Sequence, residues 1–178
     1  MSAAAPGGYG AYSCPAGRRP ACAGGRRRYA VGMRPRDEHP LVQRWDGGVH
    51  RLPIQMRFRD TDMFGHVNNV VFGTWIEIAR IAFMRGLEPP SGDLILARLE
   101  MDFVRQVTFG QRIEVQTRVA GTGRTSVRLA QTVTADDEVA SRIASVVVLY
   151  DYERMAPRPI PDAYRNALAP YRTEEREA

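Results

Sequence analysis

Hydrophobic and polar residues alternate over five stretches of the chain, which is the pattern that half-buried β-strands produce. The first stretch, IQMRFRD, places Ile54, Met56 and Phe58 on one face of a strand. The other four follow a helical segment and are separated by turn residues such as Asp136–Asp137. They are LILARLEMDFV (94–104), RIEVQTRV (112–119), RTSVRLAQTV (124–133) and EVASRIASVVVLYDY (138–152).

The segment at about residues 68–86 has apolar residues at helical spacing on two adjacent stripes. The stripes are Val71, Trp75, Ile78, Ala82 and Phe72, Ile76, Ala79, Phe83. Only a narrow strip through Gly73, Glu77 and Arg80 is polar. A helix that is apolar around most of its circumference must be enclosed by protein. Gly86 and the pair Pro89–Pro90 are expected to end it.

Strands that follow one another through hairpins form an antiparallel sheet, and the helix can cover its apolar face. We therefore predict an α+β domain at 46–162, in which an antiparallel five-stranded sheet wraps around a long central helix. Residues 163–178 are expected to form a tail or a short helix. Residues 1–45, rich in Gly, Ala and Arg, are expected to be a disordered extension. An over-extended gene start, with translation beginning at Met33, is the favoured explanation of this extension, and an arginine-rich, acid-poor transit peptide is the alternative.

Composition narrows the class of protein. The net charge is +5, and arginine supplies all of the positive charge, because the sequence contains no lysine. The arginines are not interleaved with aromatic residues on one periodic element, so we expect no nucleic-acid partner. No apolar run approaches the roughly 20 residues of a membrane-spanning helix. Both cysteines, Cys14 and Cys22, lie in the extension, which excludes a disulfide framework in the domain and makes the cytoplasm the expected compartment.

The sequence RDTDMFGHVNN (59–69) concentrates ionisable and amide side chains at the start of the helix. A calcium loop of the EF-hand type beginning at Asp60 would need oxygen ligands at its fifth and twelfth positions, where the chain has Phe64 and Val71. Asp60, Asp62 and His66 could supply three donors to zinc or iron, but no recognised ligand spacing fixes a geometry. We therefore expect no metal.

Helix capping and ion pairing account for part of this loop. Asn68 or Asn69 can serve as the N-cap of the helix. Asp60, at the end of a strand, is expected to form a salt bridge with Arg57 or Arg59. These roles leave Asp62 and the Gly65–His66 pair unexplained, and for His66 a hydrogen-bonded, partly buried position is as good an explanation as a direct role.

Asp62 has the features of a catalytic carboxylate. A carboxylate near the exposed N–H groups of a helix start stays ionised, because the donors and the helix dipole favour the charged form. The same N–H groups can polarise a carbonyl placed there. This combination is sufficient to hydrolyse a thioester, whose thiol leaves as a thiolate with a pKa of roughly 8.5. No strong general acid is then needed.

The segment MRFRDTDMFGHVNNVVFGTWIEIAR (56–80) resembles the first strand, active-site loop and central helix of the hotdog-fold acyl-CoA thioesterases, in the 4-hydroxybenzoyl-CoA thioesterase branch. GHVNN resembles the long-chain acyl-CoA thioesterases of that branch, and FGQRIEV and RPIP extend the resemblance over about residues 52–161. The chain departs from the family in having QVTFGQ where a proline is common. Many members also have a Tyr-His or similar pair where this chain has residues 66–69.

The resemblance implies a hotdog fold and hydrolysis of an acyl-CoA, with Asp62 as the catalytic carboxylate. It implies that the backbone amide of Asn69 polarises the thioester carbonyl, with Gly65 as a weaker candidate. His66 or Asn68 would orient the acid or the water. Family members are dimers or tetramers with the acyl pocket between subunits, and no cofactor is implied.

Phe64 and Phe72 are candidates for lining the acyl pocket, although core packing explains them equally well.

Two other functions stay open. A hotdog hydratase or dehydratase would act on an acyl-CoA, but its His-Asp or His-Glu arrangement is not found in this sequence. A non-catalytic module would bind acyl-CoA without hydrolysing it, and the presence of Asp62 ahead of the helix argues against that reading.

Overall fold

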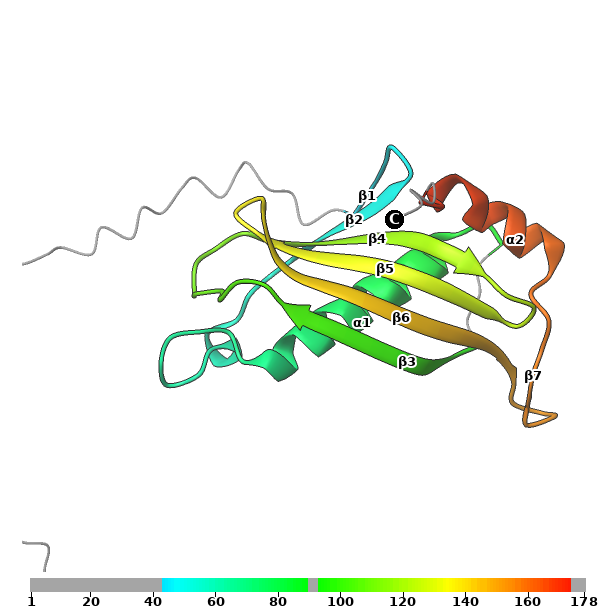
Figure 1. Cartoon of the computed structure of the whole chain (residues 1–178), viewed down its shortest axis with the longest axis horizontal. Helices are drawn as coiled ribbons and strands as arrows, with labels where there is room; N and C mark the ends of the chain where they lie inside the picture. The colour runs from blue at the N-terminus through cyan, green and yellow to red at the C-terminus, as the bar shows by residue number, and fades with distance from the viewer. Residues whose placement is uncertain (1–42, 90–92, 174–178) are drawn as a thin grey trace, which may run out of the picture. The chain divides into compact units, whose positions relative to one another are not determined.

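A single long helix, α1 (Asn69–Gly86), lies against one face of an antiparallel sheet in this computed structural model, which describes residues 43–89 and 93–173. Figure 1 shows α1 behind the sheet, crossing the strands diagonally. The predicted α+β hotdog fold, a sheet around a central helix, is thus confirmed. Nearly all of the extension predicted for residues 1–45 lies outside the described residues. Among the described residues, no helix is long and apolar enough to cross a membrane.

The sheet contains the expected four strands after the helix, one strand before it, and two short strands that the sequence pattern did not predict. The strands are β1 (Arg44–Asp46), β2 (Val49–Ile54), β3 (Leu94–Phe103), β4 (Ile113–Thr122), β5 (Ser126–Ala135), β6 (Glu138–Asp151) and β7 (Ala156–Pro157). Their spatial order is β1-β2-β4-β5-β6-β3, with β7 paired to β6, and every pairing is antiparallel. The shorter strands β1 and β7 are the additions.

The expectation that consecutive strands are joined by hairpins holds for β4, β5 and β6 but is wrong for β3. This strand pairs with β6 and lies at the edge of the sheet, far from β4. The connection between β3 and β4, residues 104–112, therefore leads from the edge of the sheet past β6 and β5 to β4. The turn between β5 and β6 uses Asp136 and Asp137 at φ of 50° and 69°, the left-handed pair that a two-residue hairpin needs.

The predicted strand over IQMRFRD is also misplaced, because the strand is β2 and ends at Ile54. The chain then enters a single turn of 3-10 helix, Phe58–Asp60, and Phe58 is 81% exposed. Asp60 explains the turn, since one of its carboxylate oxygens accepts a 2.8 Å hydrogen bond from the backbone N–H of Arg57. Its other oxygen accepts from the Arg57 side chain at 3.1 Å. A salt bridge of Asp60 with Arg57 or Arg59 was predicted; the one with Arg57 is formed, and it bends the chain.

Helix α1 begins and ends close to the predicted positions. Asn68 is its N-cap, and the helix ends at Gly86, where a side chain would collide with the ring of Trp45. Arg80, which belongs to the narrow polar strip of α1, is nevertheless buried, with only 8% of the residue exposed. The expected enclosure is incomplete within one chain, since Ile78 and Ile81 are 47% and 43% exposed.

The core follows the helix in two clusters. The first surrounds Trp75 and Ile76 near the beginning of α1, and the second surrounds Phe83 and Met84 near its end. Helix α2 (Asp162–Leu168) contributes buried Tyr164 and Leu168 to the second cluster. The short terminal helix is therefore part of the domain, which extends beyond residue 162.

The hairpin of β1 and β2 buries His50 completely. Its ring packs at a tilt of 52° against Trp45 with centroids 4.5 Å apart, and its Nε2 lies 3.2 Å from Oε1 of Gln43. Its Nδ1 is buried without a hydrogen-bond partner in the described structure. Desolvation by burial lowers the pKa of His50 from 6.5 to about 4, so the folded protein holds this ring neutral.

We predict that the free energy of unfolding falls as the pH drops from about 6.5 to about 4. In this window the unfolded chain binds a proton at residue 50 and the folded chain does not, so acid favours unfolding. The loss attributable to His50 should be at most roughly 3 kcal/mol, given how far its pKa is lowered. Urea titrations across this range measure it. His50→Phe, which keeps the aromatic packing, should show a shallower pH dependence; an unchanged slope would contradict the assignment.

Candidate active site

The loop between the 3-10 turn and α1 is closed by hydrogen bonds to Asp62. One carboxylate oxygen, Oδ1, accepts from the backbone N–H of Phe64 at 2.8 Å and of His66 at 3.1 Å. The backbone N–H of Asp62 donates to the carbonyl of His66 at 2.7 Å. Within the described residues the second oxygen, Oδ2, has no hydrogen-bond partner. The carboxylate is therefore fixed through one oxygen and free to react through the other.

Gly65 makes the tight turn of this loop possible. Its φ of +81° lies in the left-handed region that favours glycine, and its N–H donates to the carbonyl of Asp62 at 3.1 Å. This N–H is already engaged, so it is not available to polarise a substrate carbonyl as the sequence allowed. Gly65 has a structural place in the loop, and its predicted contact with substrate has no support in this geometry.

Two of the first N–H groups of α1 donate to Asn68, and one is left open. The side-chain oxygen of Asn68 accepts from the N–H of Val70 at 3.0 Å, and its carbonyl accepts from Val71 at 2.9 Å. The N–H of Asn68 itself donates to the carbonyl of Asp60 at 3.0 Å. No acceptor for the N–H of Asn69 is found in the described parts of the chain. Among the described residues, this amide is therefore the one of the first three in α1 that is left without an acceptor.

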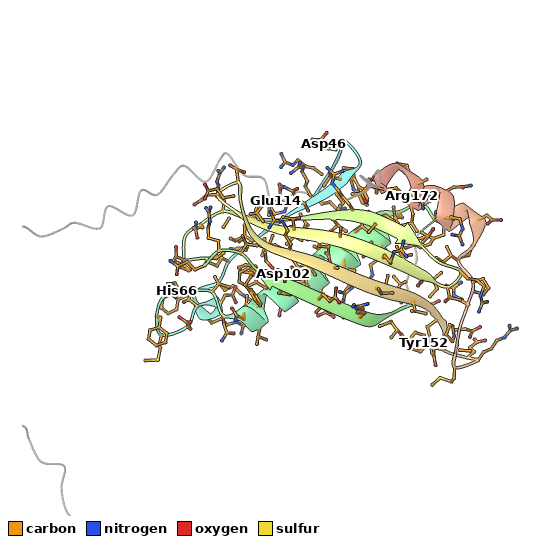
Figure 2. The ribbon with its side chains drawn as sticks, viewed as in Figure 1. Asp46, His66, Asp102, Glu114, Tyr152 and Arg172 are labelled. Carbon is orange, nitrogen blue, oxygen red and sulfur yellow. The ribbon has the colours of Figure 1, made fainter. Side chains whose placement is uncertain are left out.

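A cavity of about 430 Å³ lies beside this helix start. Five of the seven predicted site residues line it, namely Asp62, His66, Asn68, Asn69 and Phe72. The other two do not: Gly65 lies in the turn, and Phe64 is 75% exposed to solvent. Figure 2 shows His66 in the loop before α1, at the opposite end of the sheet from Tyr152.

The opposite wall of the cavity comes from the end of β3 and the residues after it, which the sequence analysis did not single out. Phe103 packs edge-on against Phe72 with ring centroids 5.4 Å apart, and Arg105 and Gln106 add polar groups. Arg105 is paired with Glu138 at the start of β6. Only the folded topology brings this wall to the loop, so no local signal in the sequence could have identified it.

The residues that could have held a metal are separated. Asp60 is 2% exposed and is held by Arg57, so it does not join Asp62 and His66. Over residues 43–89 and 93–173, no group of three or more His, Cys, Asp or Glu side chains is placed to hold a metal ion. The site offers instead a carboxylate with one free oxygen and a free backbone amide at the same cavity. These are the elements for attack on a carbonyl carbon and for stabilising the oxyanion that forms.

Comparison with known proteins gives a consistent picture. The model of the thioesterase-like superfamily matches residues 56–168. A thioesterase from Thermus thermophilus, solved with coenzyme A and Zn, is 36% identical with a TM-score of 0.63, over 70% of this chain and 94% of that chain.

Two curated relatives match more locally. The uncharacterized protein YsmA of Bacillus subtilis is 30% identical over 80 residues, which are 43% of this chain and 54% of YsmA. The chloroplastic acyl-acyl carrier protein thioesterase ATL2 of Arabidopsis thaliana is 29% identical over 82 residues, 42% of this chain and 44% of ATL2. The chain thus spans about half the length of the curated relatives it matches.

We predict that Asn68→Ala lowers the free energy of unfolding by about 1 kcal/mol, because it removes the side-chain acceptor for the Val70 N–H. Asn68→Asp keeps that acceptor and should stay within a few tenths of a kcal/mol of the wild type. Denaturant titration of the three proteins measures the difference. Equal destabilisation by both substitutions would show that the cap is not the cause.

Proposed function

The chain belongs to the thioesterase-like superfamily, and on that basis we propose that it hydrolyses an acyl-CoA thioester to a free acid and coenzyme A. The observation that carries this proposal is the state of Asp62, whose carboxylate is oriented by two amides through Oδ1 while Oδ2 stays free. Asn69, whose N–H has no acceptor among the described residues, lines the same cavity. We place the protein in the 4-hydroxybenzoyl-CoA thioesterase branch and expect it in the cytoplasm.

In the proposed reaction, Oδ2 of Asp62 either attacks the thioester carbonyl or removes a proton from an attacking water. In both routes the carbonyl oxygen gains negative charge, which the N–H of Asn69 stabilises by a hydrogen bond. The carbon–sulfur bond then breaks and coenzyme A leaves as a thiolate. In the first route, water hydrolyses the resulting mixed anhydride and regenerates the carboxylate. In the second route, the water oxygen adds to the carbonyl carbon and gives the acid directly, and Asp62 passes the proton to the departing thiolate. His66 and Asn68, at the cavity wall, would orient the carboxylate or the water.

We predict that Asp62→Asn lowers kcat by roughly 10²- to 10⁴-fold, the usual contribution of a catalytic base. An asparagine oxygen can still accept from Phe64 and His66, so the loop keeps its geometry while the charge is lost. Thiol release from a panel of acyl-CoAs measures the effect, with Asp46→Asn on β1 as the matched control.

Three outcomes would count against the proposal. Full activity in Asp62→Asn would refute the catalytic role of this carboxylate. Binding of acyl-CoA by the wild type without thiol release from any substrate would identify a non-catalytic binding module. Hydration of an enoyl-CoA without thioester cleavage would identify a hydratase.

An acyl group carried by acyl carrier protein is a second candidate substrate, and the likeness to ATL2 favours it. The reacting thioester is chemically the same, so the cavity does not distinguish the two carriers. Hydrolysis of one acyl group presented on coenzyme A and on acyl carrier protein, compared as kcat/KM, decides between them.

We further propose that the active protein is a homodimer or homotetramer with its cavity at a subunit boundary. Edge strand β3 exposes Leu96, Leu99 and Phe103, each by 40% or more, and Phe103 also lines the cavity. Its only strand partner among the described residues is β6. An exposed apolar strand edge favours pairing with another chain.

We predict that the full chain sediments at micromolar concentration with two or four times its mass of 19.9 kDa. Leu99→Glu should reduce this mass by placing a charge on the β3 edge. Met155→Glu is the control, because Met155 is an exposed apolar residue elsewhere. A stable folded wild-type monomer would contradict the proposed assembly.

A further inference from the structure

Arg80 is a buried charge that the proposed chemistry does not use. Only 8% of the residue is exposed, and across the described structure its guanidinium has no hydrogen-bond or ion-pair partner. Burial lowers its pKa, while the negative charge of Glu77, one turn earlier on α1, acts in the opposite direction. Arginine keeps its proton in proteins. Because most of this side chain is removed from water and only the charge of Glu77 offsets it, an anionic partner would be stabilised beside the guanidinium.

Arg80 lines a second cavity, of about 250 Å³, between α1 and β3. Glu77 and Arg85 are the other charged residues at this cavity, which leaves one net positive charge. The remaining lining is apolar and consists of Ile81, Met84, Leu94, Leu96 and Val147. A cavity with one excess positive charge and an apolar lining suits a ligand that is mostly hydrocarbon and ends in one negative charge.

The two cavities lie along the same flank of α1. Asn69, Gly73 and Arg80 share this flank, because they are spaced by four and seven residues. A Cβ added at Gly73 would meet no atom within 4 Å, so the surface of the helix is open at this position of the flank. On the facing strand, Phe103 borders the first cavity and Leu96 the second. Asn69 and Arg80 are about eleven residues apart on the helix, which corresponds to roughly 16 Å.

We propose that the Arg80 cavity binds the far end of the acyl group, and that this end bears a carboxylate. The inference rests on the proposed thioesterase function and specifies its substrate class as dicarboxylic acyl thioesters. With its carbonyl at the Asn69 amide, an acyl chain laid along the Gly73 flank reaches Arg80 with its terminal carboxylate. The planar guanidinium can then donate two parallel hydrogen bonds to that carboxylate.

The phosphates of coenzyme A fit this cavity less well. They carry several charges and need several donors, whereas the cavity offers one buried guanidinium among aliphatic side chains. Glu77 would also repel a multiply charged group more strongly than a monoanion. The apolar lining therefore favours the acyl end of the substrate over the coenzyme end.

The test compares plain and carboxyl-terminated acyl-CoAs of matched, increasing chain length. The wild type should prefer the carboxyl-terminated member by roughly tenfold or more in kcat/KM, mainly through KM, once the chain spans the distance to Arg80. Arg80→Met removes the charge and should abolish this preference, while Arg80→Lys should retain part of it. Arg142→Met is the control. Arg142 is an exposed arginine on β6, and because side chains alternate along a strand, it points away from the face that buries Ser141 and Ile143.

A second variant tests the proposed path of the acyl chain and leaves the charge of Arg80 unchanged. Gly73→Leu fills the open flank and should remove the preference for long carboxyl-terminated chains. Circular dichroism and denaturant titration check that each variant is folded. If Gly73→Leu keeps the full preference, the acyl chain does not follow this flank and the inference is overturned.

The remaining outcomes separate this inference from the proposed function. Hydrolysis of acyl-CoAs with no carboxylate preference at any length overturns the inference and leaves the thioesterase function standing. A change in sedimentation of Arg80→Met without a change in preference shows that a second copy of the chain fills the cavity, which also overturns it. If no thioester is hydrolysed, the proposed function fails. Calorimetric binding of a free dicarboxylic acid, lost in Arg80→Met, then still supports the cavity assignment, and its absence refutes it.

Discussion

The site depends on which of the first backbone N–H groups of α1 have an acceptor and which does not. A helix leaves its first N–H groups without partners inside the helix. Here Asn68 satisfies those of Val70 and Val71 and leaves that of Asn69 open. The loop before the helix satisfies its own N–H groups with Asp62. The N–H of Val67 ties this loop to the segment after β3 through a 2.8 Å hydrogen bond to the carbonyl of Val107, so the carboxylate and the open amide are held against the same cavity.

Sequence patterns correctly predicted those elements that are determined by interactions between residues close together in the chain. The long helix and strands β4 to β6 follow directly from apolar spacing and turn residues, and the Asn68 cap and Arg57–Asp60 pair follow from short-range chemistry. The pattern failed where a side chain competes with the backbone for hydrogen bonds. Alternation over residues 54–58 predicted a strand, but the Asp60 carboxylate accepts the Arg57 N–H and turns the chain. The short hairpin of β1 and β2 does have a local signal, the pair Gly47–Gly48, in which both residues have a positive φ.

Properties that depend on distant residues could not be predicted from the sequence. The position of β3 at the sheet edge follows from its pairing with β6, which is far away along the chain, and it brings Arg105 and Gln106 to the loop. The choice between the Gly65 and Asn69 amides needed coordinates, because it depends on which N–H already has an acceptor. The burial of Arg80 is of the same kind. Its place on the helix suggested a polar strip, whereas in the fold it lines a cavity together with apolar residues of β3 and β6.

The incomplete enclosure of α1 connects assembly with chemistry. A backbone amide stabilises an oxyanion well only where water is excluded, because water screens the charge and competes for the hydrogen bond. In one chain, Ile78 and Ile81 on α1 and Leu99 on β3 are all exposed, and these two elements border both cavities. A second chain that covered them would bury apolar surface and would also close the groove between α1 and β3. The interaction that stabilises the assembly would then supply the dry environment that the Asn69 amide needs to act on a thioester.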